Sequence, residues 1–472
     1  MAKHIHLIGI CGSAMASLAG MLQTKGYRVT GSDAAAYPPM SDLLKALGIP
    51  IMEPYAEKNL STRPDLVIVG NAISRGNLEL EAVLDQRIPF RSLAETIQHE
   101  FLPGKESLVV AGTHGKTTTT SMLAWIYEVA SKAKPEIAPS FLIGGIAENF
   151  ATSFRIREGK PFILEGDEYD TAFFDKAPKF MHYFPDGLIL THVEFDHADI
   201  YENLDAVKTA FRRLVNLVPR RGRLIAYDGS TNVDECVSRA FCAIERYGFK
   251  SGSAWRLRDL THNNRGSSWK IDRSGREWLE VSLPLAGEHN ALNATAAAAL
   301  AAGQGIDTGS IVEALSTFRS VKRRLEVRAV AAGVTIIDDF AHHPTAIRET
   351  LKALRAAYPG QRLWAVLEPR SNTLRRNVFE RELVESLSLA DGIVVAGVFK
   401  QESIPEGERM HPEKVVAALV GGGHDATLYA TADDIVQGLV PRLKARDVVA
   451  ILSNGGFDGI YEKLPQQLER RT

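Results

Sequence analysis

The chain has 472 residues, of which 45% are hydrophobic and 24% charged; this length favours about three domains over one, and the composition excludes a disordered chain. A net charge of −2 provides no overall basic field for nucleic acid. Three scattered cysteines, and the lack of an apolar run of ~20 residues, argue against export and membrane insertion, so we expect a cytoplasmic protein.

Residues 4–100 alternate short apolar runs with amphipathic stretches. The expected strands, each with the helix that follows it, are 5–8 with 14–22, 27–30 with 43–47, and 66–69 with 78–84. This β-α-β order is typical of a parallel sheet with helices on its faces. The segment 101–105, Phe-Leu-Pro-Gly-Lys, is an expected linker.

Two further sets of alternating elements follow. The second has expected strands at 108–111, 162–164 and 188–191, expected helices at 119–130 and 290–302, and a polar, strand-rich excursion at 249–284 that we expect to be antiparallel. The third has expected strands at 334–337, 363–367, 393–395 and 448–452, with helices at 346–357 and 415–419. The whole chain is therefore expected to have an α/β fold.

A glycine-rich loop joins the strand at 108–111 to the next helix, and it reads Gly112-Thr113-His114-Gly115-Lys116-Thr117-Thr118. Glycines turn backbone N–H groups toward phosphate oxygens, the lysine reaches the outer phosphates, and the threonine hydroxyl can bind Mg²⁺. The general phosphate-loop pattern would have glycine where this chain has Val110. ATP binding is predicted, against the alternative of a turn that binds no ligand.

A second glycine turn, Gly9-Ile10-Cys11-Gly12-Ser13-Ala14-Met15, ends the first strand, and Gly31-Ser32-Asp33 ends the second. The spacing fits a nucleotide site in which an acidic residue accepts a ribose hydroxyl. Because Cys11 and Met15 replace two glycines of the dinucleotide fingerprint, we expect a nucleotide other than NAD or FAD. An NAD-dependent oxidoreductase and a purely structural turn remain as alternatives.

Two acidic segments follow strands of the ATP-binding region. One is Glu165-Gly166-Asp167-Glu168-Tyr169-Asp170, and the other includes Asp196-His197. Carboxylates at strand ends are natural ligands of a hard cation, and an imidazole can hold a second ion. The alternatives are a solvated acidic loop and a structural histidine. We favour Mg²⁺ binding.

Polar residues also mark the second half of the chain. Asn290 and Asn293 share one face of an expected helix and can reach one ligand, or Asn290 can simply cap the helix. Arg323 and Arg324 lie at a domain junction, where a cation can cross to the γ-phosphate of ATP or be part of a solvated linker. Acids and imidazoles cluster where the strand at 334–337 ends, in Asp338-Asp339-Phe340-Ala341-His342-His343-Pro344.

Taken in chain order, these motifs resemble those of the Mur ligases over essentially all 472 residues. Members of that family are three-domain, ATP-dependent amide ligases of peptidoglycan synthesis. The resemblance implies a Rossmann-like UDP-sugar domain at 1–104, a P-loop ATPase domain at 105–319, and a Rossmann-like peptide-binding domain at 320–472. It also explains Val110, because the family loop is the shorter Gly-Thr-x-Gly-Lys-Thr, and the poor dinucleotide fingerprint, because UDP replaces NAD.

The resemblance implies roles for individual residues. The catalytic set is Lys116, Glu165, His197, Arg324, His342 and His343, and the residues on Mg²⁺ are Thr117, Glu165 and His197. ATP is expected on Gly112, Thr113, His114, Gly115, Lys116, Thr117, Thr118, His289, Asn290, Asn293, Arg324 and Asp339. The UDP-sugar is expected on Gly9, Cys11, Gly12, Ser13, Ala14, Met15, Ser32, Asp33, Asn71 and Ala72.

Within the family, the chain resembles the branch that acts on UDP-N-acetylmuramate. One kind of enzyme there adds L-alanine and another adds the recycled tripeptide L-alanyl-γ-D-glutamyl-meso-diaminopimelate. The sequence Leu367-Glu368-Pro369-Arg370-Ser371-Asn372-Thr373 resembles the tripeptide type, so we expect Arg370, Ser371, Asn372 and Thr373 to bind peptide. L-Alanine ligation is the alternative, and a non-catalytic nucleotide sensor is another. The carbamoylated lysine of some members is not expected, since Arg212 stands at its usual spacing and Lys208 a turn earlier.

Overall fold

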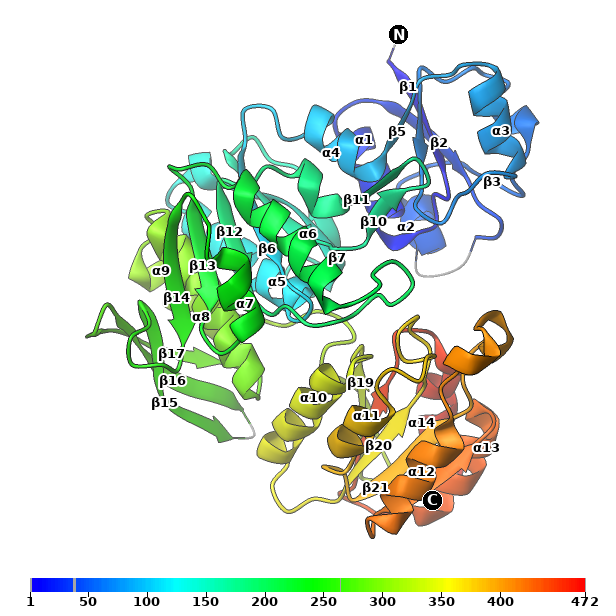
Figure 1. Cartoon of the computed structure of the whole chain (residues 1–472), viewed down its shortest axis with the longest axis vertical. Coiled ribbons are helices and arrows are strands. Elements are labelled where there is room, and N and C mark those ends of the chain that lie inside the picture. Colours follow the sequence, from blue (N-terminus) through cyan, green and yellow to red (C-terminus); the bar gives the residue numbers. More distant parts are fainter. Residues whose placement is uncertain (1, 37–39, 264, 472) are drawn as a thin grey trace.

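The computed structural model describes residues 2–36, 40–263 and 265–471, and these form three α/β domains in chain order (Figure 1). The N-terminal domain is a parallel five-stranded sheet with the strand order β3-β2-β1-β4-β5. Its strands are β1 His4–Ile8, β2 Arg28–Ser32, β3 Ile51–Met52, β4 Leu66–Val69 and β5 Phe90–Ser92. Its helices are α1 Ser13–Thr24, α2 Met40–Ala46, α3 Leu78–Asp85 and α4 Leu93–Glu100.

The central domain is built on a ten-stranded sheet with the order β17-β16-β15-β14-β13-β12-β6-β9-β7-β8. The strands are β6 Glu106–Ala111, β7 Ser140–Ala147, β8 Thr152–Arg155, β9 Pro161–Gly166, β12 Gly187–Leu190, β13 Arg223–Tyr227, β14 Ala243–Gly248, β15 Trp255–Asn263, β16 Gly266–Arg273 and β17 Arg276–Leu283. A separate pair consists of β10 Asp170–Ala172 and β11 Asp175–Pro178. The helices are α5 Lys116–Ser131, α6 Leu204–Leu217, α7 Thr231–Val237, α8 Glu288–Gly303 and α9 Thr308–Ser316.

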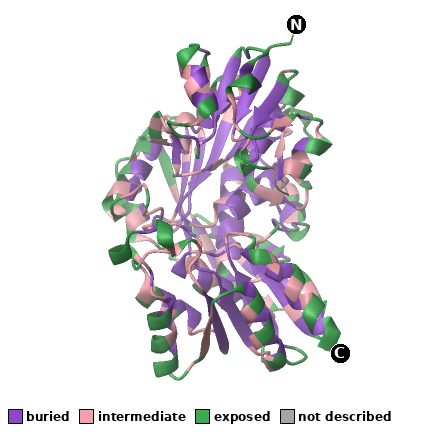
Figure 2. Ribbon diagram, turned by 90° about the vertical axis from the view of Figure 1, so that its right-hand side faces the viewer, coloured by how far each residue is buried: buried purple, intermediate pink, exposed green. Residues whose placement is uncertain are grey.

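Both faces of the sheet are covered around β6, β9 and β12, which explains why these central strands are largely apolar. Leu108 and Val110 of β6 pack with α5 and α8, whereas Val109 and Ala111 pack with α6 on the opposite face. In Figure 2 the central strands of the sheets are buried, and most exposed residues lie on helices and loops. Polar groups can therefore meet ligands at the strand ends.

The C-terminal domain has a six-stranded sheet in the order β18-β19-β23-β20-β21-β22, in which β18 alone among these strands is antiparallel. The strands are β18 Glu326–Ala331, β19 Val334–Asp339, β20 Leu363–Leu367, β21 Gly392–Ala396, β22 Asp425–Tyr429 and β23 Val448–Leu452. The helices are α10 Pro344–Ala357, α11 Glu380–Leu387, α12 Pro412–Gly421, α13 Ala432–Leu439 and α14 Ile460–Arg471.

The α/β class and the parallel sheets predicted from the sequence are confirmed. The excursion at 249–284 contains antiparallel β15, β16 and β17, but β14 and β15 pair in parallel. Sequence reasoning missed several short or polar elements, including β3, β10, β11, β18 and β22. Among the described residues, no helix is both long enough and apolar enough to cross a bilayer.

The chain passes from the central to the C-terminal domain within a few residues. Val321 pairs with Ala147 of the central sheet, and the Lys322 N–H donates to the Ile146 carbonyl. By contrast, the Arg323 side chain bonds to Asp338 and to the Ser453 carbonyl of the C-terminal domain. The crossover therefore lies between residues 322 and 323.

Candidate active site

The phosphate loop is held tightly between β6 and α5. Gly112 and Gly115 have φ angles of +131° and +81°, which favour glycine. A Cβ atom on Gly112 would lie 2.2 Å from Thr191 Oγ1, and one on Gly115 would lie 2.6 Å from Asn293 Oδ1. Glycine is therefore needed here both for backbone conformation and for the close approach of β12 and α8.

Lys116 begins α5 and forms a buried ion pair with Glu168. Its Nζ lies 2.8 Å and 2.6 Å from the two carboxylate oxygens, and Glu168 also lies 3.3 Å from His197 Nε2. Burial lowers the pKa of Lys116, but the charges of Glu168 and Asp167 outweigh it and raise the pKa overall. Burial likewise opposes the proton on His197, yet the hydrogen bond and charge of Glu168 raise its pKa to about 9. The carboxylate of Glu168 thus favours the protonated form of both side chains, and His197 would have to lose its proton to bind a metal ion.

Thr117 and Glu165, both predicted at the metal, are in direct contact. Thr117 Oγ1 donates to Glu165 Oε1 at 2.9 Å, and the Gly144 N–H donates to Oε2 at 2.6 Å. Burial raises the pKa of Glu165, while Lys116 opposes the shift. The third predicted ligand, His197, instead groups with Asp167 and Glu168, with donor atoms within 4.8 Å of one another. These oxygen-rich donors beside Lys116 fit Mg²⁺.

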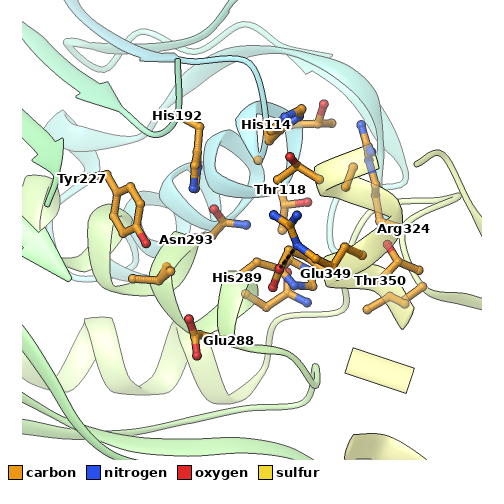
Figure 3. A pocket seen from close by; sticks show the side chains of 18 of the residues that line it. His114, Thr118, His192, Tyr227, Glu288, His289, Asn293, Arg324, Glu349 and Thr350 are labelled. Atoms are coloured by element: carbon orange, nitrogen blue, oxygen red, sulfur yellow. Dashed lines mark hydrogen bonds and ion pairs between the residues drawn. The ribbon is translucent and has the colours of Figure 1, made fainter. Parts of the chain in front are cut away.

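A cavity of about 460 Å³ lies beside the phosphate loop, between the central and C-terminal domains. Most residues predicted to bind ATP line it: His114, Gly115, Thr117, Thr118, His289, Asn290, Asn293, Arg324 and Asp339. In Figure 3, Tyr227 and His192 lie on one side of Asn293, and Arg324 lies on the other. The cavity thus combines groups from both domains.

Three of these residues have contacts that refine their predicted roles. Asn290 Nδ2 donates to the Ala286 carbonyl, and Gly287 is the N-cap of α8, so Asn290 does not cap the helix. The Asp339 carboxylate accepts the N–H groups of Leu325 and Ala341, and it therefore orders the backbone beside Arg324. Of the two neighbouring arginines, Arg323 bonds within the C-terminal domain and Arg324 lines the cavity.

Residues 192–199, which we call the bridging loop, connect the two domains across this cavity. Glu194 Oε2 accepts from His114 Nε2 at 3.0 Å and from Thr345 Oγ1 of α10 at 2.7 Å. Burial raises the pKa of Glu194, but the hydrogen bond and charge of His114 outweigh it and hold the pKa well below its usual range. Sequence reasoning missed Glu194 and Thr345, which are 151 positions apart in the sequence and are joined by a hydrogen bond.

The expected catalytic histidines differ in their surroundings. His343 Nδ1 accepts the Thr345 N–H as the N-cap of α10, and Nε2 faces the Phe195 carbonyl at 3.2 Å. Both ring nitrogens of His343 therefore have partners within the protein, and its catalytic role stays a prediction. His342 Nδ1 contacts the Phe340 carbonyl, and Nε2 lies 3.9 Å from Asp196 Oδ2.

The predicted peptide-binding segment is divided between two environments. Thr373 is 1% exposed and donates to Asp196 Oδ1 at 2.6 Å, so its side chain belongs to the domain contact rather than to an open site. Asn372 Nδ2 contacts Asp199 Oδ2, and Ser371 Oγ contacts the His342 carbonyl. Arg370, Ser371 and Asn372 also line a separate pocket.

At the N-terminal glycine turn, backbone groups are more available to a ligand than side chains are. Gly12, Ser13 and Ala14 are exposed, and α1 begins at Ser13 without a side-chain cap, which suits an anion. The side chains of Cys11, Met15 and Ser32 are buried, and Ser32 Oγ donates to Glu79, so the prediction that these three residues bind the UDP-sugar concerns their backbone groups.

Two other predicted UDP-sugar residues already have protein partners. The Asp33 carboxylate accepts the N–H groups of Cys11 and Ala34 and thereby orders the turn. Asn71 Nδ2 donates to Asp170 Oδ1 of the central domain, next to exposed Ala72. Lys208 and Arg212, at the spacing of the modified lysine, both contact Glu235 of α7.

We expect acid to destabilise the fold through two buried imidazoles. Burial, reinforced by the charge of His114, lowers the pKa of His192 and of His343 from 6.5 to about 4. Between these pH values the unfolded chain binds protons that the folded chain does not, so stability falls as the pH falls. Each shift is worth about 3 kcal/mol. Calorimetry from pH 7 to pH 4 measures the effect.

His343→Asn keeps a side chain that can cap α10 but cannot titrate. We expect its melting temperature to change less between pH 6.5 and pH 4 than that of the wild type. An unchanged pH dependence would contradict the role assigned to the buried imidazole.

Three family models match successive parts of the chain. "Mur ligase family, catalytic domain" matches residues 4–101, "Mur ligase middle domain" matches 110–301, and "Mur ligase, glutamate ligase domain" matches 323–455. Each match corresponds to one of the three domains.

The chain is also similar to individual proteins along its whole length. It is 41% identical over 469 residues to the UDP-N-acetylmuramate–L-alanyl-gamma-D-glutamyl-meso-2,6-diaminoheptandioate ligase of Escherichia coli (strain K12), and 37% identical over 468 residues to the protein of the same name from Haemophilus influenzae, with 99% of every chain covered. A crystal structure of a murein peptide ligase from Psychrobacter arcticus 273-4 matches with 34% identity, a TM-score of 0.74 and 99% coverage of both chains. The chain belongs to the Mur ligase family.

Proposed function

We propose that this protein uses ATP to join L-alanyl-γ-D-glutamyl-meso-diaminopimelate to UDP-N-acetylmuramate, with Mg²⁺ as cofactor, in peptidoglycan recycling. The observation that carries the proposal is that the phosphate loop, through His114, Gly115, Thr117 and Thr118, and the C-terminal domain, through Arg324, meet at one cavity. The Escherichia coli and Haemophilus influenzae relatives are named as ligases of this tripeptide, which supports the tripeptide as the acceptor.

The chemistry requires activation of a carboxylate. The lactyl carboxylate of the sugar attacks the γ-phosphorus of ATP, ADP leaves, and an acyl phosphate forms. The neutral amine of the peptide's L-alanine then attacks the acyl carbon, inorganic phosphate leaves, and the nitrogen loses a proton to give the amide. An amide, ADP and phosphate are the products.

The residues around the cavity supply the electrostatics of this reaction. Lys116, at the N-terminus of α5, stabilises negative charge on the transferring phosphoryl group, and Arg324 adds a cation from the opposite domain. The residues that would hold magnesium are Thr117, Glu165, Asp167, Glu168 and His197. When bound, Mg²⁺ neutralises phosphate charge. Closure of the domains over the cavity would keep out water, which would otherwise hydrolyse the acyl phosphate.

The deciding experiment measures phosphate release from ATP with Mg²⁺ and UDP-N-acetylmuramate. We expect release with the tripeptide to exceed release with free L-alanine, with the ligated product identified by its mass. Release with L-alanine alone would assign the protein to the first step of peptide assembly instead. The lack of substrate-dependent release with either acceptor would favour a nucleotide sensor.

A further inference from the structure

Two groups of metal-ligating side chains occur among the described residues. One is the oxygen-rich group around His197 described above. The other consists of His114, Glu194 and His343, which we call the interdomain cluster, and its ligand atoms likewise lie within 4.8 Å of one another. The interdomain cluster differs in kind, because it presents two imidazole nitrogens and one carboxylate oxygen.

The interdomain cluster joins three separate segments of the chain. His114 belongs to the phosphate loop, Glu194 to the bridging loop, and His343 is the N-cap of α10 in the C-terminal domain. His114 Nε2 lies 3.0 Å and His343 Nδ1 lies 3.6 Å from the same oxygen, Glu194 Oε2. The ring centroids of the two imidazoles are 4.6 Å apart. An ion bound between these atoms would therefore contact both domains at once.

A hydrogen bond does not account for the contact between His343 and Glu194. The Phe195 carbonyl can only accept, so His343 Nε2, 3.2 Å away, carries the ring proton. His343 Nδ1 accepts the Thr345 N–H and is therefore unprotonated. A nitrogen lone pair and a carboxylate oxygen thus lie 3.6 Å apart with no proton between them, and a cation would stabilise this arrangement.

The contacts of His343 are those of a metal ligand. A ligating histidine usually donates its second ring N–H to a carboxylate, a carbonyl or water, which fixes the tautomer and the orientation of the ring. His343 Nε2 faces the Phe195 carbonyl in this way. The bond from the Thr345 N–H to Nδ1 is long, at 3.2 Å, so a metal ion can replace it at little cost. His114 Nε2 would give up the proton that it shares with Glu194.

The ligand atoms of the interdomain cluster favour zinc over magnesium. Mg²⁺ prefers six oxygen ligands, whereas Zn²⁺ binds imidazole nitrogen and carboxylate oxygen in tetrahedral sites. His114 and Glu194 line the cavity of about 460 Å³ beside the phosphate loop. An ion can therefore enter from this cavity, and a water molecule there can serve as the fourth ligand.

We propose that the interdomain cluster is a zinc-binding site, separate from the magnesium site of the ligation reaction. Zinc bound there fastens the phosphate loop to the N-terminus of α10 and holds the central and C-terminal domains together. The site adds a second, chemically different metal to the same domain contact.

Calorimetric titration with Zn²⁺ tests the site in the full-length protein, without nucleotide and with Mg²⁺ in excess. We expect the wild type to bind zinc. His343→Asn keeps a side chain that can cap α10, and it is expected to weaken zinc binding by at least about 100-fold, the upper end of the loss caused by removing a group that only supports a ligand. Glu194→Gln keeps the shape of the side chain, should weaken binding as well, and tests the site if His343→Asn fails to fold.

His197→Asn is the matched control, because His197 is the imidazole of the other group. We expect this variant to keep the zinc ion that His343→Asn loses. Zinc binding that survives both His343→Asn and Glu194→Gln, or that is lost only in His197→Asn, would place the ion at the magnesium site and overturn the proposal. A wild type that binds no zinc would overturn it as well.

Small-angle X-ray scattering tests the link between the domains. In the nucleotide-free wild type, the radius of gyration is expected to be smaller with Zn²⁺ than with a chelator, and His343→Asn should show no such difference. A radius that zinc leaves unchanged in the wild type would refute the link. Neither measurement requires ligation, so their outcome is independent of the proposed function.

Discussion

Lys116→Met is expected to lower ATP-dependent ligation by about 10²- to 10³-fold, the cost of removing one preorganised electrostatic contact to a transition state. Lys116 lies at the N-terminus of α5, beside the glycines that shape the phosphate loop. Without the charge of Lys116, the transferring phosphoryl group has one cation fewer at the place where negative charge develops. Steady-state ADP release and single-turnover product formation would measure the loss.

The same substitution also affects stability, and the structure supplies a control. Glu168 is 1% exposed, so removing Lys116 leaves a buried carboxylate whose remaining cationic partner among the described residues is His197, at a cost of about 3–5 kcal/mol. The double variant Lys116→Met/Glu168→Gln removes both charges, and we expect it to regain stability but not activity.

A second control tests whether any lysine on α5 would have the same effect. Lys132→Met removes the C-cap lysine at the other end of that helix and should behave like the wild type, because the Lys132 side chain is 66% exposed and pairs with Glu313 at the surface. A folded double variant that ligates within tenfold of the wild-type rate would refute the role of Lys116.

Glu194→Ala is expected to lower kcat by about 10- to 100-fold because one of its oxygens joins the phosphate loop to α10 through His114 and Thr345. Both contacts are charge-assisted, and their loss weakens the docking of the C-terminal domain on the bridging loop. We expect a larger population of open molecules, measured by small-angle X-ray scattering with ATP and substrate bound, together with the slower turnover.

A double-mutant cycle isolates the interdomain part of this effect. Thr345→Val removes the bond from α10 and leaves that from His114, so the double variant Glu194→Ala/Thr345→Val should be little worse than Glu194→Ala alone. Glu313→Ala, on the surface of α9, is the matched control. Additive losses in the double variant would show that Thr345 does not act through Glu194.

The sequence predicts the parts of the site that are local in the chain. The phosphate loop requires its glycines, lysine and threonine within seven consecutive residues, so residues 112–118 could be recognised without a structure. Strands buried on both faces, such as β6 and β20, are continuous apolar runs and were predicted for the same reason. Short strands such as β3, with two residues, carry too little pattern to be identified.

Pairings between distant residues could not be predicted in this way. Glu168 lies within a run of acids, and nothing in the run shows that this residue, rather than Glu165 or Asp167, holds Lys116 at a separation of 52 positions. Thr373 resembled a peptide ligand because of its motif, yet its hydroxyl contacts Asp196 of another domain. Such roles depend on how the domains pack, and this packing is set by many weak contacts.

The crossover between residues 322 and 323 has a mechanical consequence for catalysis. Backbone hydrogen bonds hold Val321 and Lys322 against the central sheet, and Arg324 follows two residues after Lys322. When a rigid body turns about a pivot, points near the pivot move little and distant points move far. Arg324 can therefore stay close to the nucleotide while parts of the C-terminal domain farther from the crossover move over larger distances and can bring the acceptor amine toward the activated carboxylate.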